Sequence, residues 1–375
     1  MKTRYLALDF FRGLTIALMI VVNTPGTWEH VYAPLRHAPW HGCTPTDLVF
    51  PFFLFIVGVA MWFTYGKRSD GLTWPIAAKL LRRTALIFLI GLALNAFPFF
   101  NKHWESLRIM GVLQRIGLAF GAAGFICVLL PKRAVAWAAA ALLLAYWGIL
   151  WYFGGDDPYG KEGNIVRHID MALLGPKHLY QQYGLPFDPE GLFSTLPAIV
   201  NVLLGYLTGS WIAEAGNAAE DADNSKKALC LRLLRNGVLI AVIGWLWDVA
   251  FPVNKPLWTS SYVLYTSGLA MIFLSLCIWM FDIRGWKSVA QPFLVFGANP
   301  LFAYVLSGLI VKTLMQFKST GPDGMVHTAY GWIYPHLFAP INDGPFGSLL
   351  FALTYALMIW LLCWILYRKN ILIKI

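Results

Sequence analysis

The stretch Asp47-LVFPFFLFIVGVAMWFT-Tyr65 decides the fold class. After Asp47 it contains no charged side chain. A transmembrane α-helix needs about 20 mostly apolar residues to cross the hydrocarbon core of a bilayer, and this run has that length. It therefore predicts a membrane-spanning helix, and similar runs recur along the whole chain.

The composition indicates the same class of protein. The chain has 375 residues, of which 58% are hydrophobic and 13% are charged. Soluble domains are about 45–50% apolar and about 25% charged. This chain has too few polar side chains to cover a soluble fold, and it is too apolar to be disordered. The composition therefore excludes an ordinary soluble enzyme and indicates a polytopic membrane protein.

Ten runs are long and apolar enough to be spanning helices by the same criterion. They cover residues 6–23, 47–65, 76–97, 109–130, 134–153, 192–213, 231–251, 262–281, 290–316 and 346–367. The ninth run contains Asn299-Pro300, and a proline inside a helix breaks or kinks it. We therefore predict an all-α polytopic membrane protein with about ten transmembrane helices, the ninth being one bent helix or two short pieces.

The basic residues predict the orientation, because cytoplasmic loops of membrane proteins carry an excess of Lys and Arg. With the N-terminus inside, 19 of the 29 Lys and Arg residues fall on the cytoplasmic side, nine fall outside, and Arg115 lies within a run. Both termini are therefore predicted to be cytoplasmic. The net charge of +10 then follows from topology rather than from nucleic-acid binding, and all eight histidines lie outside.

The chain is predicted to form a single transmembrane domain, residues 1–375. Helix groups at residues 1–213 and 231–375 are joined by residues 214–230, EAGNAAEDADNSKKALC, which are polar and lack aromatic side chains. Such a composition is typical of a flexible linker. On the outer side, residues 24–46, 154–191 and 317–345 form three long loops, and long loops often fold over a site.

The loop between the first two runs gathers side chains suited to proton transfer. Asn23 ends the first run, Asp47 begins the second, and His37 and His41 lie between them. A histidine oriented by a carboxylate is a workable general base. Asp47 is equally suited to be the N-cap of its helix, and spacing alone does not choose between the two histidines.

Charged residues inside the runs need a partner or a function, because they are costly in a bilayer. Asp9 and Arg12 are three residues apart in the first run, so they share a helix face and form either a structural ion pair or part of a site. Arg115, preceded by Gln114, either pairs with a carboxylate such as Asp9 or Asp47 or binds an anionic ligand.

Two further outer segments combine polar and aromatic side chains. Asp188 and Glu190 precede the sixth run, where capping of a helix N-terminus is the simpler explanation. Asn254, Lys255 and Trp258 join the seventh and eighth runs and are able to hold a sugar by hydrogen bonds and ring stacking. Trp258 is equally suited to be an aromatic of the membrane interface.

A basic cluster on the cytoplasmic side suits phosphate groups, although topology by itself explains such residues. It consists of Lys79, Arg82, Arg83, Lys132 and Arg133. The sequence contains no Walker A motif, no dinucleotide-binding glycine motif and no HExxH motif. Functions based on ATP, dinucleotides or zinc hydrolysis therefore have no support, and the scattered cysteines show no metal spacing.

Taken together, these motifs resemble the heparan-α-glucosaminide N-acetyltransferase family. The similar segments keep their order over nearly the whole chain. They are LDFFRG at residues 8–13, VN at 22–23, HAPWHG at 37–42, DLVFP at 47–51, GVLQR at 111–115, LLG at 173–175, HLYQ at 178–181, DPEG at 188–191, PVNK at 252–255, LW at 257–258 and YRK at 367–369.

The resemblance implies an enzyme that moves an acetyl group across a membrane. Acetyl-CoA would come from the cytosol, and the acceptor would be the amine of glucosamine or of a terminal glucosamine residue on the far side. Members of the lysosomal branch carry an additional N-terminal region and first helix, which this sequence lacks. We therefore expect a bacterial inner-membrane protein with a periplasmic site loop, acting on free glucosamine or a small amino-sugar oligomer.

The family pattern places the essential histidine at His37, with Asn23 as its neighbour. His37 would remove the proton of the attacking amine, Asp47 would orient the imidazole, and Asn23 would stabilise the developing oxyanion. Direct transfer in a ternary complex and a covalent acetyl-histidine relay both remain open.

The remaining predicted site residues are sorted by ligand. CoA is expected at Arg12, Arg82, Arg83, Gln114, Arg115, Lys132 and Arg133, and the acceptor sugar at Trp40, His41, Asp188, Glu190, Asn254, Lys255 and Trp258. The expected partners are the lipid bilayer, acetyl-CoA, an amino sugar and, by family analogy, a second copy of the chain. Neither a metal nor a nucleic acid is expected. The alternative function is an amino-sugar transporter without acyl transfer.

Overall fold

The computed structural model describes residues 5–66, 71–99, 104–181, 183–217, 222–320 and 326–373. In these ranges almost all regular structure is helical. The strands form one antiparallel hairpin of β1 (Lys318–Thr320) and β2 (Val326–Thr328), in which Ser319 lies opposite His327. The predicted all-α class is confirmed.

Each predicted apolar run corresponds to a helix or to a pair of helices. The long helices are α1 (Leu6–Asn23), α2 (Val49–Tyr65), α3 (Trp74–Ala96), α4 (Val112–Leu129), α5 (Lys132–Phe153), α7 (Thr195–Gly216), α8 (Ala222–Trp247), α9 (Ser260–Cys277), α10 (Lys287–Ala298), α11 (Pro300–Leu314) and α13 (Pro345–Arg368). The shorter elements are η1 (Ala33–Leu35), η2 (Pro45–Leu48), η4 (Trp104–Ser106), α6 (Ile165–Leu174), η5 (Pro176–His178), α12 (Ala329–Ile333) and the π-helical η6 (Ile278–Ile283) and η7 (Tyr334–Phe338).

Eight helices of the described ranges are long and apolar enough to cross a membrane. The count becomes nine if α10 and α11, bent by 72° at the predicted Asn299-Pro300 break, form one span. The helix that separates this count from the predicted ten is α3. It has the length of a span, but Lys79, Arg82 and Arg83 lie along it, and charged side chains are costly in hydrocarbon.

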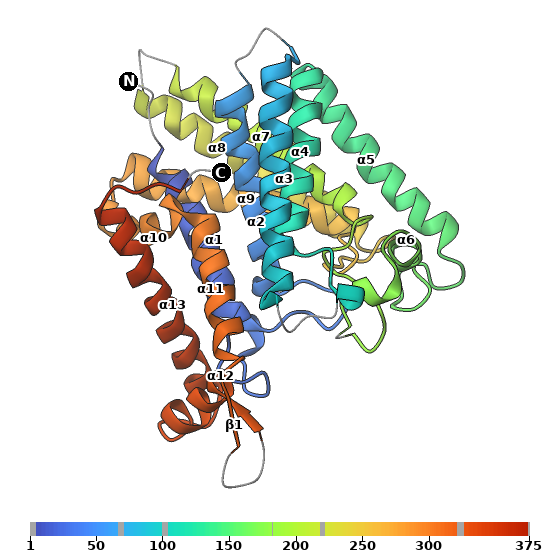
Figure 1. The fold of residues 1–375 in the computed structure, drawn as a ribbon. Helices are drawn as coiled ribbons and strands as arrows, with labels where there is room; N and C mark the ends of the chain where they lie inside the picture. Colours follow the sequence, from blue (N-terminus) through green and yellow to red (C-terminus); the bar gives the residue numbers. More distant parts are fainter. Residues whose placement is uncertain are drawn as a thin grey trace.

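The long loops lie together at one end of the helices. Figure 1 shows that the connections from α1 to α2, from α5 to α7 and from α11 to α13 all lie at the bottom of the molecule. We call this the loop end. The beginning of α1 and the end of α13 lie towards the opposite end (Figure 1). The segments selected as candidate site residues in the outer loops are therefore on one face.

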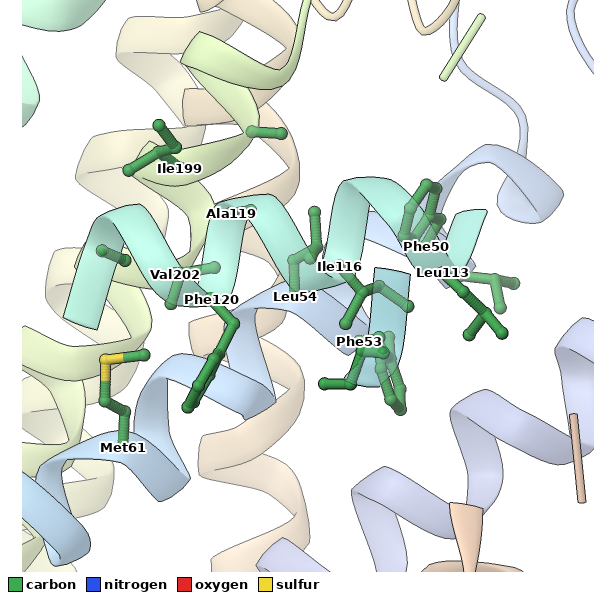
Figure 2. Close-up of a cluster of buried hydrophobic side chains, with 14 of the residues drawn as sticks. Phe50, Phe53, Leu54, Met61, Leu113, Ile116, Ala119, Phe120, Ile199 and Val202 are labelled. Atoms are coloured by element: carbon green, nitrogen blue, oxygen red, sulfur yellow. The ribbon is translucent and has the colours of Figure 1, made fainter. Parts of the chain in front are cut away.

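The centre of the bundle is formed by α2, α4 and α7, which pack against one another. Figure 2 shows their interdigitating side chains, among them Phe53 and Leu54 of α2, Phe120 of α4 and Val202 of α7. These helices are apolar on most faces, which is typical of helices buried inside a bundle. They form the framework from which the loops of the loop end project.

Two glycines let α2 and α7 approach backbone to backbone. A Cβ atom at Gly58 would lie 2.0 Å from the carbonyl oxygen of Val202, and one at Gly205 would lie 2.0 Å from that of Phe55. Membrane helices often pack closely through small residues, because lipid provides no hydrophobic driving force between them. No side-chain layer therefore separates α2 from α7 at these points.

The stretch predicted as a flexible linker, residues 214–230, is mostly helical. Residues 214–216 continue α7 and residues 222–230 begin α8, while residues 218–221 lie outside the described part of the chain. Glu214 of α7 binds Lys132 of α5 at 2.6 Å and Arg232 of α8 at 3.0 Å. The polar composition thus belongs to the exposed ends of two helices, which ion pairs connect.

The segment after α13 is held at the break between α10 and α11. The buried Asn299 side chain donates to the carbonyl of Ile371 at 2.9 Å and accepts from the N–H of Ile373 at 2.7 Å. Backbone groups freed by a broken membrane helix need partners within the protein. Here the Asn299 side chain at the break supplies such partners to the backbone of Ile371 and Ile373.

We expect Gly58→Ala to lower the thermal stability of the detergent-solubilised protein. The added methyl group has no room between α2 and α7, so the helices must separate, at a cost of ~1–3 kcal/mol. The matched control is Gly148→Ala in α5, because nothing lies within 4 Å of a Cβ atom there. Equal melting temperatures for Gly58→Ala and the wild type would contradict the close contact of α2 with α7.

Candidate active site

Asp47 is the centre of a buried hydrogen-bond network at the loop end. The residue is 1% exposed and lies in η2, directly before α2. Its Oδ2 accepts from the N–H of Ala38 and from the N–H and hydroxyl of Thr44, each at 3.0 Å. Its Oδ1 contacts His37 Nδ1 at 2.6 Å and Lys255 Nζ at 3.3 Å. Both carboxylate oxygens are therefore engaged.

The N-cap position predicted for Asp47 is occupied by Thr44, and Asp47 is the third residue of η2. From there its carboxylate reaches back to the Thr44 N–H, as in a capping box. The structural role and the contact with His37 therefore coexist in one side chain, because each uses a different oxygen.

The network decides which nitrogen of His37 is available. Nδ1 faces Asp47, and 2.6 Å is the distance of a strong charge-assisted hydrogen bond. Nε2 has no hydrogen-bond partner among the described residues, and the side chain is 41% exposed. The imidazole therefore offers Nε2 to the open side, in the arrangement by which a carboxylate orients a basic histidine.

The turn between α8 and α9 supplies the second half of the site. Lys255 places Nζ 3.1 Å from His37 Nδ1, and Asn254 places Nδ2 3.2 Å from His41 Nδ1. The N–H of Gly42 donates to the carbonyl of Val253 at 2.7 Å and joins the histidine loop to this turn. The structure therefore brings together two of the predicted segments, HAPWHG and PVNK.

Trp258 closes this turn as a fully buried side chain. Its Nε1 donates to Asn201 of α7 at 2.9 Å, and its backbone φ of 53° lies in the left-handed region that bulky residues rarely adopt. Tyr262 packs edge-on against its ring and donates its hydroxyl to the Asp47 carbonyl at 2.5 Å. Trp258 thus supports the site from below, with no exposed ring face for a sugar.

Arg115 lies in the same supporting layer. The side chain is fully buried, and its guanidinium is 4.7 Å from the centre of the Trp258 ring. Its Nη2 donates to the Ser194 hydroxyl and to the Gly191 carbonyl, the latter at 3.2 Å. Arg115 therefore fixes the beginning of α7 against the turn before α9.

A charge cluster borders the site on the side of α7. Arg108 donates Nε and Nη2 to Asp188 at 2.8 and 2.6 Å, and Nη2 also to Glu190 at 2.7 Å. Its guanidinium lies 4.6 Å from the centre of the Tyr180 ring. The acidic pair that the sequence assigned to helix capping therefore binds an arginine.

Glu190 is an ionised member of this cluster. Burial alone would raise its pKa, but the charges of Arg108 and Arg115 outweigh burial and lower the pKa. Lys255 contributes in the same direction. A carboxylate in electrostatic range of Lys255 is suited to bind an ammonium group or a sugar hydroxyl.

Asn23 does not join the His37 network. It is the last residue of α1, its side chain is exposed, and no hydrogen bond connects it to the described residues. The end of α1 is fixed elsewhere, since the Thr24 hydroxyl donates to the Ile20 carbonyl at 2.8 Å. Asn23 is therefore open to a ligand, but it is not held by His37.

The residues predicted to bind CoA separate into two groups. Arg12 and Arg83 lie in electrostatic range of each other, in the first half of α1 and of α3 respectively. Arg83 is 4.6 Å from the centre of the Phe120 ring, and its buried Nε has no hydrogen-bond partner. Gln114 and Arg115 lie at the loop end instead, where the Gln114 side chain donates to the Ile109 carbonyl at 2.9 Å.

The other residues predicted to bind CoA through its phosphates are exposed. Lys132 is held by Glu214 in an exposed ion pair. Arg82 and Arg133 are exposed. The pair Arg12 and Arg83 is therefore the part of the basic cluster that is sheltered enough to form a phosphate site.

Trp40 is mostly buried beside the histidines. Its Nε1 donates to the Tyr159 carbonyl at 2.8 Å, its ring packs edge-on against Phe187, and Lys161 Nζ lies 5.8 Å from its centre. His41, in contrast, is exposed. Of the two neighbours, His41 is therefore the one accessible to a ligand.

Four residues that organise the site were not selected from the sequence. They are Arg108, Asp170, Ser194 and Asn201. Asp170 of α6 is 1% exposed and accepts the Phe193 N–H at 2.9 Å. Arg108 was visible as an outer-side arginine directly before a run, but nothing in its surroundings indicated which acids it would bind.

The geometry defines a class of protein. A bundle of apolar helices carries a histidine–carboxylate pair at its loop end, which is a polytopic membrane protein with a site equipped for proton transfer. Within the described residues, no group of three or more His, Cys, Asp or Glu side chains is placed to hold a metal ion. Residues 4–240 match the model of the family described as heparan-α-glucosaminide N-acetyltransferase, catalytic, so the chain belongs to that family.

Two curated relatives agree with this family. The chain is 27% identical to the human heparan-α-glucosaminide N-acetyltransferase, over 99% of its own length and 60% of the relative. It is 26% identical to the mouse protein of the same name, over 80% of its own length and 53% of the relative. The chain thus spans between half and two thirds of the length of these relatives.

We expect Arg108→Gln to destabilise the protein strongly. The substitution leaves the fully buried Asp188 without its cation, and breaking a buried ion pair costs ~3–5 kcal/mol. Lys132→Gln is the matched control, because its pair with Glu214 is about half exposed and such pairs contribute ~0–1 kcal/mol. Thermal unfolding in detergent measures both variants, and similar melting temperatures would show that the Arg108 cluster is not structural.

Asp170 should contribute a loss of stability as the pH rises from about 4 to 6. Burial raises the pKa of Asp170 to about 6, above the unfolded value, so the folded state favours the protonated form. The stabilisation is complete below the unfolded pKa and is lost as the pH passes the folded one. Asp170→Asn should remove this contribution. A melting curve for Asp170→Asn as steep in pH as that of the wild type would exclude it.

Proposed function

We propose that the protein is a transmembrane N-acetyltransferase that transfers acetyl from acetyl-CoA to the amine of glucosamine or of a terminal glucosamine residue. The observation that carries the proposal is the 2.6 Å contact of His37 with the buried Asp47, in a chain of this family. The family is one of N-acetyltransferases, and a histidine held by a carboxylate is the group such a reaction needs.

His37 is the general base of the proposed reaction. The acceptor amine must lose a proton before or during its attack on a carbonyl carbon, and Nε2 of His37 is the free nitrogen that takes it. Asp47 holds the opposite nitrogen and stabilises the imidazolium that forms. The carboxylate is able to do so because its other hydrogen bonds, to Ala38 and Thr44, fix it in place.

Acetyl-CoA, when bound, supplies an activated acetyl thioester. Arg12 and Arg83 are suited to its phosphates, because the buried Arg83 Nε lacks a hydrogen-bond partner among the described residues and the two cations lie in electrostatic range of each other. Asn23, open at the end of α1, is the proposed donor to the oxyanion. Arg115 and Gln114 hold the loop end together in this scheme rather than binding CoA.

The proposed transfer is balanced without a further reactant. The amine nitrogen forms a bond to the carbonyl carbon, the carbon–sulfur bond breaks, and the proton taken by His37 passes to the leaving thiolate. A relay through acetylated His37 uses the same groups in two steps. Incubation with acetyl-labelled CoA without an acceptor distinguishes the routes, since only the relay leaves label on the protein.

The acceptor is proposed to bind at the loop end. Glu190 is an ionised carboxylate in electrostatic range of Lys255, and His41 is an exposed side chain of the histidine loop. The distribution of Lys and Arg supports cytoplasmic termini and a loop end on the opposite side of the membrane. The proposed membrane is a bacterial inner membrane, with the loop end in the periplasm. A homodimer is proposed by analogy with the family alone.

Sealed vesicles separate this function from the alternative, an amino-sugar transporter. Acetyl-CoA is supplied on one side and glucosamine on the other, and the products are free thiol and N-acetylglucosamine. Detergent-solubilised protein must also produce both. Uptake of unchanged glucosamine without release of thiol would support the transporter and contradict the enzyme.

We expect His37→Ala and Asp47→Asn each to lower the rate of N-acetylglucosamine formation by ~10²-fold or more, because both remove the oriented base. His168→Ala is the matched control: its Nδ1 contacts only a backbone carbonyl, that of Asn164 in α6, at 2.9 Å. The assay follows product and free thiol in parallel. Near-normal activity of His37→Ala would overturn the assignment of the site.

A further inference from the structure

The two histidines of the HAPWHG segment are held by consecutive residues of one turn. His37 Nδ1 lies 3.1 Å from Lys255, and His41 Nδ1 lies 3.2 Å from Asn254. The bond from Gly42 to Val253 keeps the loop and the turn in register. Both imidazoles therefore turn Nδ1 towards the protein, but they meet different partners there.

The partner of His41 has a fixed orientation. The Asn254 Oδ1 accepts the N–H of Leu257 at 2.7 Å, and a backbone N–H donates only to an oxygen. The nitrogen of this amide must therefore be the atom that faces His41. Asn254 is fully buried, and its backbone N–H is held separately by the Thr259 hydroxyl at 3.0 Å. A flip of the side-chain amide would place its NH₂ group against the Leu257 N–H, so the bond with Leu257 fixes the orientation.

This orientation fixes the proton of His41. An amide NH₂ group is only a donor, so the facing Nδ1 must be a bare acceptor. The proton of the neutral imidazole then lies on Nε2. His37 differs, because its Nδ1 also faces the carboxylate of Asp47 at 2.6 Å, closer than Lys255 at 3.1 Å, and this acceptor keeps the proton on Nδ1. The Lys255 ammonium group has the same carboxylate as its own acceptor, at 3.3 Å. The turn thus sets one histidine as an acceptor and the other as a donor towards the open side.

The surroundings keep His41 neutral. Adding a second proton at Nδ1 would place two donors against each other at 3.2 Å. The charged groups in range are Asp157 and Asp248, which favour the cation, but the partial burial of the ring on its Nδ1 side outweighs them and lowers the pKa of His41. The Nε2–H has no acceptor among the described residues, and the side chain is exposed. The Nε2–H of His41 is therefore available to donate to an oxygen of a ligand.

We infer that His41 is a neutral hydrogen-bond donor to an oxygen of the acceptor sugar, and that Asn254 is the residue that sets it in this state. The inference rests on the proposed function, since it names what the acceptor side of that site recognises. A hydroxyl or ring oxygen of an amino sugar accepts such a bond, whereas its ammonium group cannot. His41 thus orients the sugar, while His37 takes the proton.

The first test observes the tautomer directly. Protein labelled with ¹⁵N in the imidazole rings is examined by long-range ¹H–¹⁵N correlation, with His41→Gln identifying the His41 signals. We expect the wild type to show a proton on Nε2 and a bare Nδ1 at pH 7. Asn254→Asp keeps the acceptor for Leu257 but offers His41 an oxygen, so the proton should move to Nδ1. A wild-type His41 protonated at Nδ1 would overturn the inference.

The second test measures the acceptor KM. His41→Ala and Asn254→Asp should each raise the KM for glucosamine roughly five- to tenfold with little change in the KM for acetyl-CoA, the range of one hydrogen bond. His41→Gln is the control, because its amide nitrogen can donate from the position of Nε2. In a His41→Ala background Asn254→Asp should add no further rise. An equal rise in that background would show that Asn254 acts by another route, and would overturn its role.

The two hypotheses fail in different ways. An active His37→Ala protein would overturn the assignment of the base and leave the His41 spectra as they are. A wrong His41 tautomer, in contrast, would leave acetyl transfer by the wild type unaffected. A large loss of kcat in His41→Ala with an unchanged acceptor KM would place His41 at the reacting carbonyl instead of the sugar, and would contradict the inference.

Discussion

The arrangement of the loop end depends on one buried carboxylate. Asp47 is almost inaccessible to solvent at the beginning of a membrane helix, where an uncompensated charge would be prohibitively costly. Its oxygens therefore have to be saturated by donors, and these come from Ala38, Thr44, His37 and Lys255. Satisfying the charge folds the histidine loop back on η2 and draws the turn before α9 against it. The arrangement of the candidate site thus follows from the need to satisfy one buried charge.

Most of the fold could be predicted from the sequence, because in a membrane protein the length and apolarity of a run nearly determine a helix. The break at Asn299-Pro300 could also be predicted, because proline removes a helical hydrogen bond. Composition failed at residues 214–230, where charged side chains that suggest a linker instead form ion pairs between helix ends. It was also ambiguous for α3, whose basic residues lie on an otherwise apolar helix.

The candidate site could be predicted as a set of segments but not as a set of contacts. The short loop between the first two runs predicted a histidine beside Asp47, the family resemblance selected His37 over His41, and the structure joins His37 with Asp47. Arg115 is buried and has partners, but these are Ser194 and Trp258 rather than the carboxylates of Asp9 or Asp47 that the sequence suggested, and they are remote in sequence. The same holds for Arg108 and its acids. Pairings of this kind depend on how helices approach one another, which no local pattern of one sequence reveals.

The contact of α2 with α7 has a consequence for motion. Because Gly58 and Gly205 bring the two backbones together without intervening side chains, a separation of these helices would have to break direct backbone contact. Asp47 lies directly before α2, and Asp188 and Glu190 lie just before α7, so all three carboxylates are attached to this pair of helices. Lys255 and Asn254 belong to the α8–α9 hairpin instead. A separation of this hairpin from α2 and α7 would break the contacts of Lys255 and Asn254 with the two histidines. It would also break the bonds from Gly42 to Val253, from Trp258 to Asn201 and from Tyr262 to Asp47.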